Sequence, residues 1–201
     1  KNGIPADFKY VAVIESGLVN VVSPAGAKGI WQFMPDTAKE IGLEVNENID
    51  ERYHLEKATE AACVYFLKAK EKFGNWTLVA AAYNAGGTGV KKQMDTQRVT
   101  NYYDLLLNDE TSRYVFRILA LKQIMEHPEQ YGFPIAEEEQ YRIVATKKIV
   151  IDSSVTDLAS LAIQQGINYK ILKIHNPWLR TTKMLNPTNK KYQLEIPLEG
   201  Y

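Results

Sequence analysis

The sequence has few of the residues that build disulfide frameworks and metal sites. It contains one cysteine, Cys63, and three histidines, at positions 54, 127 and 175, which lack the spacing of metal ligands. Cys63 lies in a helical run, where we expect it to pack as a small apolar side chain, and we interpret the histidines as structural or surface groups. We therefore expect no disulfide, no metal and no cofactor.

Excess charge and long apolar runs are also missing. Lys plus Arg and Asp plus Glu each number 24, so the net charge is zero, whereas binding to a phosphate backbone needs a basic excess. No stretch is apolar enough to cross a bilayer, and there is no signal peptide. Nucleic acid is therefore excluded as a partner. The cytoplasm is not implied, because an export signal or a lipid anchor ahead of Lys1 would lie outside these 201 residues.

The composition is that of a globular protein, with 45% hydrophobic and 24% charged residues. From Pro5 to about His127 the apolar residues recur at helical spacing, and Gly and Pro mark the connections. The expected helices cover residues 5–17, 35–42, 55–73, 76–83, 99–107 and 110–125. The pattern predicts an all-helical domain over residues 1–136.

The pattern changes after Pro134. Residues 141–145 and 148–151 are rich in β-branched side chains and predict strands. Asp152–Ser154 offers a helix N-cap, two short helices should follow, the first ending at Gly166 and the second covering residues 169–175, and residues 192–197 alternate like a strand. We expect a small strand-helix-helix-strand module over residues 137–201.

Glu15 stands out in the first expected helix. It falls on the same face as four largely apolar positions, Ile4, Phe8, Val11 and Ala12. A carboxyl group at the end of such a stripe is partly desolvated, which disfavours its charged form and raises its pKa. Glu15 is thus a candidate general acid, although an isolated Glu at a helix end more often reaches water.

Four motifs around these residues resemble the soluble-lytic-transglycosylase (SLT) type of domain. They read ESGL at 15–18, SPAGAKGIWQFMPDTA at 23–38, AAAYNAGG at 80–87, and ET with RYV at 110–115. Within that family the chain most resembles the membrane-bound lytic murein transglycosylase D group, which joins such a domain to LysM modules. The resemblance implies a mainly α, lysozyme-like fold followed by a small α+β LysM-like module.

The resemblance also implies roles for single residues. Glu15 would be catalytic, and the implied substrate-binding residues are Ser16, Ser23, Gln32, Met34, Tyr83, Asn84 and Tyr114. Ser16 is alternatively a cap at the helix end, and Tyr114 a core aromatic, although its hydroxyl would reach Glu15 if their helices pack together. The glycines at 86–89 follow a helix and lack a Lys-Ser or Lys-Thr pair, so they are not a phosphate loop.

Glycoside hydrolysis ordinarily needs two carboxylates, and the motifs supply one. The resemblance implies a solution that uses no water: Glu15 would protonate the departing oxygen and then, as a base, would accept the proton of the muramic acid's own C6 hydroxyl. The product is a 1,6-anhydromuramyl end. Asp36 and Glu40 are the acids nearest in sequence to the second motif. Either would make the protein a hydrolytic muramidase or chitinase if it activated a water.

Residues 141–197 resemble a LysM module, a fold that binds N-acetylglucosamine chains. Ile151-Asp152-Ser153 stands where the family usually has Gly-Asp-Thr, which leaves open a glycan-binding module and a degenerate one that braces the helical domain. The expected protein is an exported, monomeric enzyme of peptidoglycan strands, periplasmic or associated with the outer membrane, and compatible with a lipid anchor. A catalytically disabled wall-binding protein is the non-enzymatic alternative.

Overall fold

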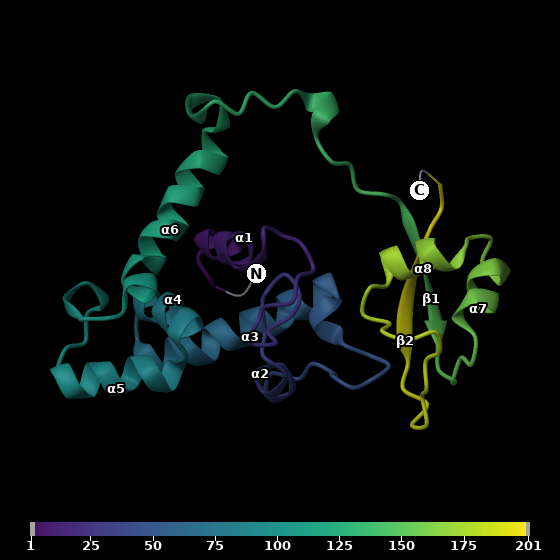
Figure 1. Cartoon of the computed structure of the whole chain (residues 1–201), viewed down its shortest axis with the longest axis horizontal. Helices are drawn as coiled ribbons and strands as arrows, with labels where there is room; N and C mark the ends of the chain where they lie inside the picture. Colours follow the sequence, from purple (N-terminus) through teal and green to yellow (C-terminus); the bar gives the residue numbers. More distant parts are fainter. Residues whose placement is uncertain (1–2, 200–201) are drawn as a thin grey trace. The chain divides into compact units, whose positions relative to one another are not determined.

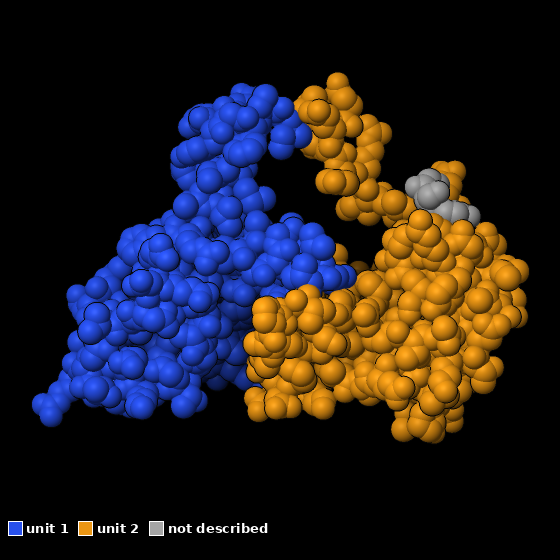
Figure 2. Space-filling view, in the orientation of Figure 1, with its two compact units in different colours: residues 1–21, 30–32, 59–135 blue, residues 22–29, 33–58, 136–201 orange. Residues whose placement is uncertain are grey.

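The computed structural model describes residues 3–199 and divides them into two compact units (Figure 2). Unit 1 contains the described residues up to Val21, together with 30–32 and 59–135. Unit 2 contains 22–29, 33–58 and the described residues from Ala136 onward. The division groups residues 33–58 with the C-terminal module, so the boundary between 136 and 137 remains a prediction about domains.

Unit 1 is helical, and helix α3, Leu55–Phe73, lies mostly within it. Its other elements are a 3₁₀ turn at Ala6–Phe8, α1 Lys9–Ser16, α4 Trp76–Ala85, α5 Gly87–Gln97, a 3₁₀ turn at Tyr102–Asp104, α6 Asp109–Glu126 and a 3₁₀ turn at Pro128–Tyr131 (Figure 1). Helix α4 packs against α5 and α6, and α1 packs against α6. Across residues 3–199, none of the helices is both long and apolar enough to span a membrane.

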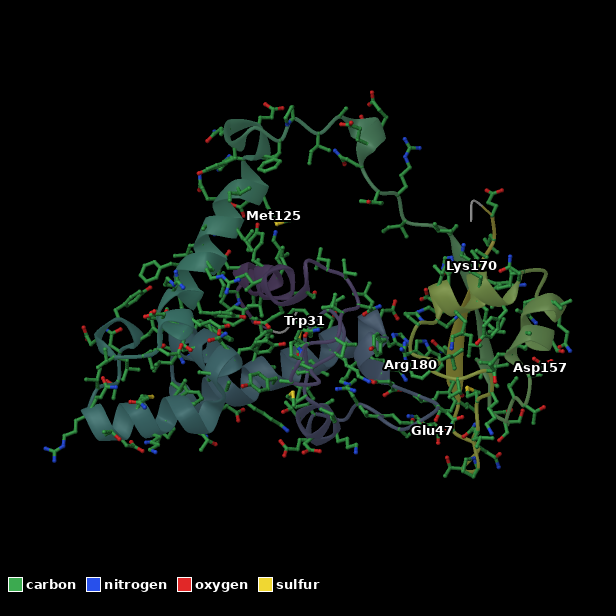
Figure 3. The ribbon with its side chains drawn as sticks, in the orientation of Figure 1. Trp31, Glu47, Met125, Asp157, Lys170 and Arg180 are labelled. Carbon is green, nitrogen blue, oxygen red and sulfur yellow. The ribbon has the colours of Figure 1, made fainter. Side chains whose placement is uncertain are left out.

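The core of unit 1 forms around aromatic side chains. Phe66 of α3 lies with its ring centre 4.7 Å from that of Phe8 and 5.1 Å from that of Tyr83. The ring of Trp31, labelled in Figure 3, meets Phe66 edge-on, and its indole N–H donates to the Thr59 hydroxyl at 3.0 Å. These large side chains bury much apolar area and join the 3₁₀ turn before α1 to α3 and α4.

Unit 2 contains the small sheet. Its elements are α2 Pro35–Glu40, 3₁₀ turns at Glu51–Tyr53 and Glu137–Glu139, β1 Thr146–Ile151, α7 Leu158–Gln164, α8 Tyr169–His175 and β2 Tyr192–Pro197 (Figure 1). β1 and β2 pair antiparallel, with Thr146 opposite Pro197 and Ile151 opposite Tyr192. Helix α7 packs on α8, and α8 packs on β2. The predicted fold class, a helical domain with a strand-helix-helix-strand module, is confirmed.

One predicted helix is wrong and one helix was missed. Residues 99–107 contain only the 3₁₀ turn at Tyr102–Asp104, whereas α5 covers Gly87–Gln97. The glycines at 86–89 indicated a loop, but a single residue makes the turn. Gly86, with φ +79°, ends α4 and begins α5 at once, a conformation that costs glycine little.

Two details of the C-terminal module also differ from expectation. Residues 141–145 do not form a strand, because β2 ends at Pro197, opposite Thr146, and offers them no partner strand. The cap of α7 is Asp157, whose carboxylate accepts from the Ala159 N–H at 2.9 Å, and not the Asp152–Ser154 run. The predicted bounds of α3, α8 and β2 agree with the structure.

Asn75 is expected to contribute measurably to the stability of unit 1. Its side-chain oxygen accepts from the Leu78 N–H at 2.9 Å and caps α4. Asn75→Ala should lower the free energy of unfolding by about 1 kcal/mol, as measured by urea denaturation. Asn75→Asp keeps the side-chain acceptor and should lower the free energy of unfolding much less. An equal loss in both variants would contradict the capping role.

Candidate active site

Glu15 lies in the last turn of α1, just before Gly17 ends the helix in a left-handed conformation. Phe8, Val11 and Ala12 on the same face are buried, while Glu15 itself is half-buried. The carboxyl group therefore stands at the edge of the core of unit 1, as the apolar stripe predicts. This position removes part of its hydration while leaving it accessible.

Tyr114 of α6 reaches this carboxyl. Its side chain is fully buried, and its hydroxyl donates to Glu15 Oε1 at 2.5 Å. The contact depends on the packing of α1 against α6. It also depends on where α6 begins, and the Asn108 side chain fixes that start by accepting from the Thr111 N–H at 2.8 Å. Both earlier interpretations of Tyr114 hold together: the residue is a core aromatic, and its hydroxyl meets Glu15.

The surroundings of Glu15 raise its pKa above the ordinary value of 4.5. Burial is the largest cause. The Tyr114 hydrogen bond lowers the pKa, the charge of Glu110 raises it, and the charge of Arg117 lowers it. Burial prevails because the hydration that the carboxylate loses stabilised it more than the single hydrogen bond from Tyr114 does. Glu15 is accordingly protonated to a higher pH than a solvated carboxyl, as its position in the sequence predicts.

Glu110 and Arg117 act on Glu15 but were not predicted as its neighbours. Both lie on α6, four residues before and three residues after Tyr114, and such spacing places side chains on one helix face. If Tyr114 reaches Glu15, this spacing predicts that Glu110 and Arg117 lie near Glu15 as well. The charged surroundings of the acid are thus set by α6 as well as by α1.

Tyr83 and Asn84 close α4 beside α6. The Tyr83 hydroxyl donates to the Trp31 carbonyl at 2.5 Å, and burial raises its pKa, with the charge of Glu15 adding to the effect. The Asn84 side chain accepts from the Thr111 hydroxyl at 2.8 Å and donates to Glu110 at 3.1 Å. Tyr83 is therefore a neutral donor, and Asn84 is held rigidly between two residues of α6.

Ser16 serves the backbone around it. Its Oγ lies 3.0 Å from the Ala12 carbonyl and 2.9 Å from the Ile30 carbonyl, and it accepts from the Leu18 N–H at 3.1 Å. One hydroxyl proton satisfies one carbonyl at a time. This arrangement corresponds to the helix-end cap weighed for Ser16, and it ties the end of α1 to the second motif at Ile30.

Two residues beside the motifs have unusual backbone conformations. Leu18 and Gln32 have φ of +62° and +49°, a region that residues other than glycine rarely adopt. The Gln32 side chain donates to the Val21 carbonyl at 3.1 Å. Leu18 and Val19 are also more than half exposed despite being apolar. Strained backbone concentrates at functional sites, and no local pattern in the sequence predicts these conformations.

Ser23 and Met34 belong to unit 2; Ser23 begins the second motif, and Met34 lies in its second half. The Ser23 hydroxyl accepts from the Ala27 N–H at 3.0 Å and closes a turn. Met34 precedes α2 and is 42% exposed. Between them, Gly29 has φ +79°, and a Cβ at this position would lie 1.9 Å from the Arg52 carbonyl oxygen. Only glycine fits there.

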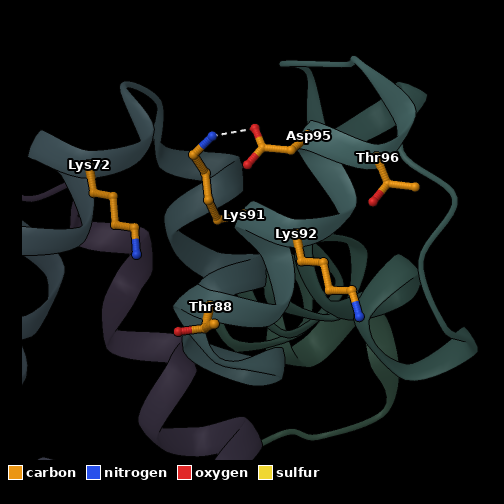
Figure 4. Close-up of a pocket in the computed structure, with 6 residues that line it drawn as sticks. All are labelled: Lys72, Thr88, Lys91, Lys92, Asp95 and Thr96. Atoms are coloured by element: carbon orange, nitrogen blue, oxygen red, sulfur yellow. Dashed lines mark hydrogen bonds and ion pairs between the residues drawn. The ribbon is translucent and has the colours of Figure 1, made fainter.

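One cavity of unit 1 lies away from these residues. It measures about 360 Å³ and is lined by Lys72, Thr88, Lys91, Lys92, Asp95 and Thr96 (Figure 4). Lys91 pairs with Asp95. None of the candidate site residues lines this cavity. Within residues 3–199, no group of three His, Cys, Asp or Glu side chains is placed to hold a metal ion.

Comparisons with known proteins agree with this arrangement of motifs. A family model described as "Transglycosylase SLT domain" matches residues 1–106, and one described as "Soluble lytic transglycosylase C-terminal LysM-like domain" matches residues 147–200. Because the first match covers more than half of the chain, the protein belongs to the SLT transglycosylase domain family. The predicted family is confirmed.

Curated relatives point to one group within this family. The chain is 31% identical over 182 residues to proteins named membrane-bound lytic murein transglycosylase D from Escherichia coli strain K12 and from Escherichia coli O6:H1. The alignment covers 88% of this chain and 40% of each relative. The chain thus spans about two fifths of the length of the relatives it matches.

The raised pKa of Glu15 predicts a pH-dependent cost in stability. The folded state binds this proton more tightly than the unfolded state, so the stability that the protonated carboxyl contributes is fully present below the ordinary pKa of 4.5. It is lost as pH rises through the folded-state pKa. Glutamine cannot ionise, so Glu15→Gln avoids this loss of stability. The melting temperature of the variant should therefore exceed that of the parent at neutral pH, and the difference should narrow toward acid pH.

Thermal melting across this pH range measures the effect. Glu60→Gln, at an exposed position of α3, is the matched control and should show no widening gap. A gap for Glu15→Gln that stays constant with pH, or that reverses sign at neutral pH, would contradict the raised pKa.

Proposed function

We propose that this protein is a peptidoglycan lytic transglycosylase in which Glu15 acts first as acid and then as base. The observation that carries the proposal is the half-buried Glu15 carboxyl, with raised pKa, hydrogen-bonded to the buried Tyr114. Membership of the SLT family and the names of the curated relatives support murein as the substrate. A general acid works best when its pKa lies near the working pH.

In the proposed reaction, one bond to C1 of N-acetylmuramic acid breaks and another bond to the same atom forms. Glu15 gives its proton to the oxygen that leaves toward N-acetylglucosamine, and the C1–O4 bond breaks. The C6 hydroxyl of the same muramic acid then attacks C1, and its proton returns to the Glu15 carboxylate. Water takes no part. The nucleophile is already tethered to the reacting centre, which removes much of the entropic barrier.

The other candidate residues receive supporting roles in this proposal. Tyr114 holds the Glu15 carboxyl in one orientation through both protonation states, because its own raised pKa keeps it a neutral donor. Asn84 and Gln32 orient the substrate's N-acetyl group as positive charge develops on the sugar. Asn84 uses one amide hydrogen on Glu110 and one lone pair on Thr111, so its second hydrogen and second lone pair suit a ligand. Met34, Ser23 and Tyr83 remain predicted substrate-binding residues, and Ser16 supports the end of α1 through the backbone.

Murein also sets the proposed location. An enzyme of murein must be exported, and the relatives are named as membrane-bound proteins. We therefore place this protein outside the cytoplasm, in the periplasm or at the outer membrane, and retain a lipid anchor and a monomeric state as part of the proposal. Binding of N-acetylglucosamine chains by the C-terminal module belongs to the same proposal.

A hydrolytic muramidase is the second candidate, because a second carboxylate acts on Glu15. The charge of Glu110 raises the pKa of Glu15, and a hydrolase needs such a group to activate water. The Glu110 carboxylate already accepts from Asn84, which favours a role in holding Asn84. Asp36 and Glu40, the acids considered from the sequence, lie in the α2 region of unit 2.

Mass spectrometry of digested murein should find 1,6-anhydromuramyl ends and no reducing muramyl ends. Glu15→Gln should lower turnover by at least about a hundredfold, the usual contribution of general acid-base catalysis. Its binding to sacculi in a pelleting assay should persist. Glu110→Gln is the matched control and should still give anhydro ends. Reducing ends that disappear in Glu110→Gln would establish the muramidase instead, and normal lysis by Glu15→Gln would remove this residue from the mechanism.

Tyr114→Phe should shift the alkaline limb of the pH-rate profile to higher pH. The Tyr114 hydrogen bond lowers the pKa of Glu15, whereas burial raises it. Removing the hydrogen bond should therefore raise the pKa of Glu15 further. Glu15 must be protonated to act as an acid, and activity therefore persists to higher pH even as the rate falls.

Tyr102→Phe provides the control for this shift. The Tyr102 hydroxyl donates to backbone carbonyls of α6, at Thr111 and Ser112, and makes no hydrogen bond to Glu15. Its removal should lower stability without moving the limb. A limb that moves to lower pH in Tyr114→Phe would contradict the assigned hydrogen bond.

A further inference from the structure

A segment from the SLT-matching part of the chain is built into unit 2 beside the C-terminal module. This 44–56 segment, Glu44–Glu56, folds back on itself: Val45 bridges Asp50, and the Glu51 N–H donates to the Glu44 carbonyl at 2.9 Å. Ile49 at its tip is fully buried. The apolar cluster that contains it consists of Ile49, Tyr53, Leu158, Ala162, Ile167, Leu172, Trp178, Leu179, Met184, Tyr192, Leu194 and Ile196. Two of these twelve residues come from the segment, so the core of the module is incomplete without it.

Backbone hydrogen bonds join the segment to the module in a defined register. Ile49 pairs with Leu179 as an antiparallel bridge. The Asp50 N–H donates to the Trp178 carbonyl at 2.9 Å, and the Arg180 N–H donates to the Asn48 carbonyl at 2.8 Å. Side-chain burial alone would allow the segment to slide, whereas these bonds specify one alignment.

Side chains reinforce this register at both ends of the segment. Glu44 accepts from Lys190 at 2.6 Å and from the Tyr192 hydroxyl at 2.9 Å. Arg180, labelled in Figure 3, lies over the Tyr53 ring with 4.0 Å between guanidinium carbon and ring centre. His54 stacks on Trp178. The attachment is therefore apolar at its centre and charged at its rim, as in a stable protein interface.

The segment also contacts the loop of the second motif, residues 26–33. Asp50 and Arg52 form a buried bidentate ion pair, with nitrogen-oxygen distances of 2.9 and 2.8 Å. Arg52 then donates to the Phe33 carbonyl at 3.0 Å and to the Gly26 carbonyl at 3.3 Å. The Arg52 carbonyl is the group that leaves no room for a Cβ at Gly29.

We propose that the C-terminal module fixes the second-motif loop through the 44–56 segment, and that Arg52 is a positioning residue for it. Asp50 links the two contacts, because its N–H bonds the module at Trp178 while its carboxylate orients Arg52. Arg52 fixes the carbonyls on either side of the stretch 27–32, which includes Gln32. The module thereby acts as a brace of the loop, whether or not it binds glycan. The effect on turnover rests on the proposed function, whereas the structural coupling does not.

The linker before β1 allows the coupling to be tested without removing any part of the protein. Tyr141 and Ile143 are fully exposed. A protease recognition site inserted between Gln140 and Tyr141 would cut the chain after folding. The two fragments should co-elute in gel filtration at micromolar concentration, because the 44–56 segment holds the module non-covalently. Fragments that separate on cleavage would overturn the proposal.

Matched variants locate the attachment. Ile49→Ala should raise the dissociation constant of the cleaved fragments at least about thirtyfold, given the usual cost of truncating a buried Ile. Ile118→Ala, an equal truncation in α6, should leave it unchanged. If Ile49→Ala does not fold, Lys190→Ala replaces it, with Lys191→Ala as its neighbour control, since Lys191 is exposed and has no partner among residues 3–199. Equal dissociation constants for a variant and its control would overturn the assigned contact.

Arg52→Lys tests the positioning role, because lysine keeps the charge but lacks the planar fork. Hydrogen-deuterium exchange, measured well below the melting temperature, should rise in peptides covering residues 22–33 and stay unchanged in α4 and α6. KM for murein should rise more than kcat falls. Unchanged exchange at 22–33 would overturn the positioning role. An inactive parent with the expected exchange and co-elution would instead refute only the proposed function.

Discussion

Partial dehydration of the Glu15 carboxyl is the constraint on which the arrangement of unit 1 depends. A carboxyl left in water would have its ordinary pKa, and one buried without a partner would destabilise the fold. Packing of α1 on α6 meets both conditions, because it covers one side of the acid with apolar groups and supplies the Tyr114 hydroxyl. The cap at Asn108 and the aromatic core around Phe66 serve this same placement.

Much of the fold could be predicted because local and tertiary preferences agree. The apolar spacing of 55–73 and the alternation of 192–197 each match the face that the structure buries, and these bounds were predicted correctly. The prediction was wrong where a local signal conflicts with packing. Glycines at 86, 87 and 89 disfavour a helix, but Val90 is fully buried and holds α5 in place.

The candidate site divides in the same way. The sequence pointed to Glu15 and its raised pKa, since one helix face determines how far the carboxyl is buried. The influence of Glu110 and Arg117, the left-handed Gln32 and the buried Asp50–Arg52 pair depend on contacts between segments far apart in the chain. No single-helix pattern contains that information. The roles of the substrate-binding residues and the boundary between domains remain predictions.

The burial of Ile49 beside Leu179 also has a consequence for the order of folding. During synthesis the 44–56 segment emerges long before the residues that cover it, so its apolar tip must wait for the C-terminal strands and helices. Contacts between residues so far apart close late and carry a high entropic cost. Before the C-terminal module is made, Ile49 and Tyr53 form an exposed apolar surface on a nascent chain whose helical part has already begun to fold. Residues 158–196, which are synthesised after the 44–56 segment, therefore decide when that segment becomes ordered.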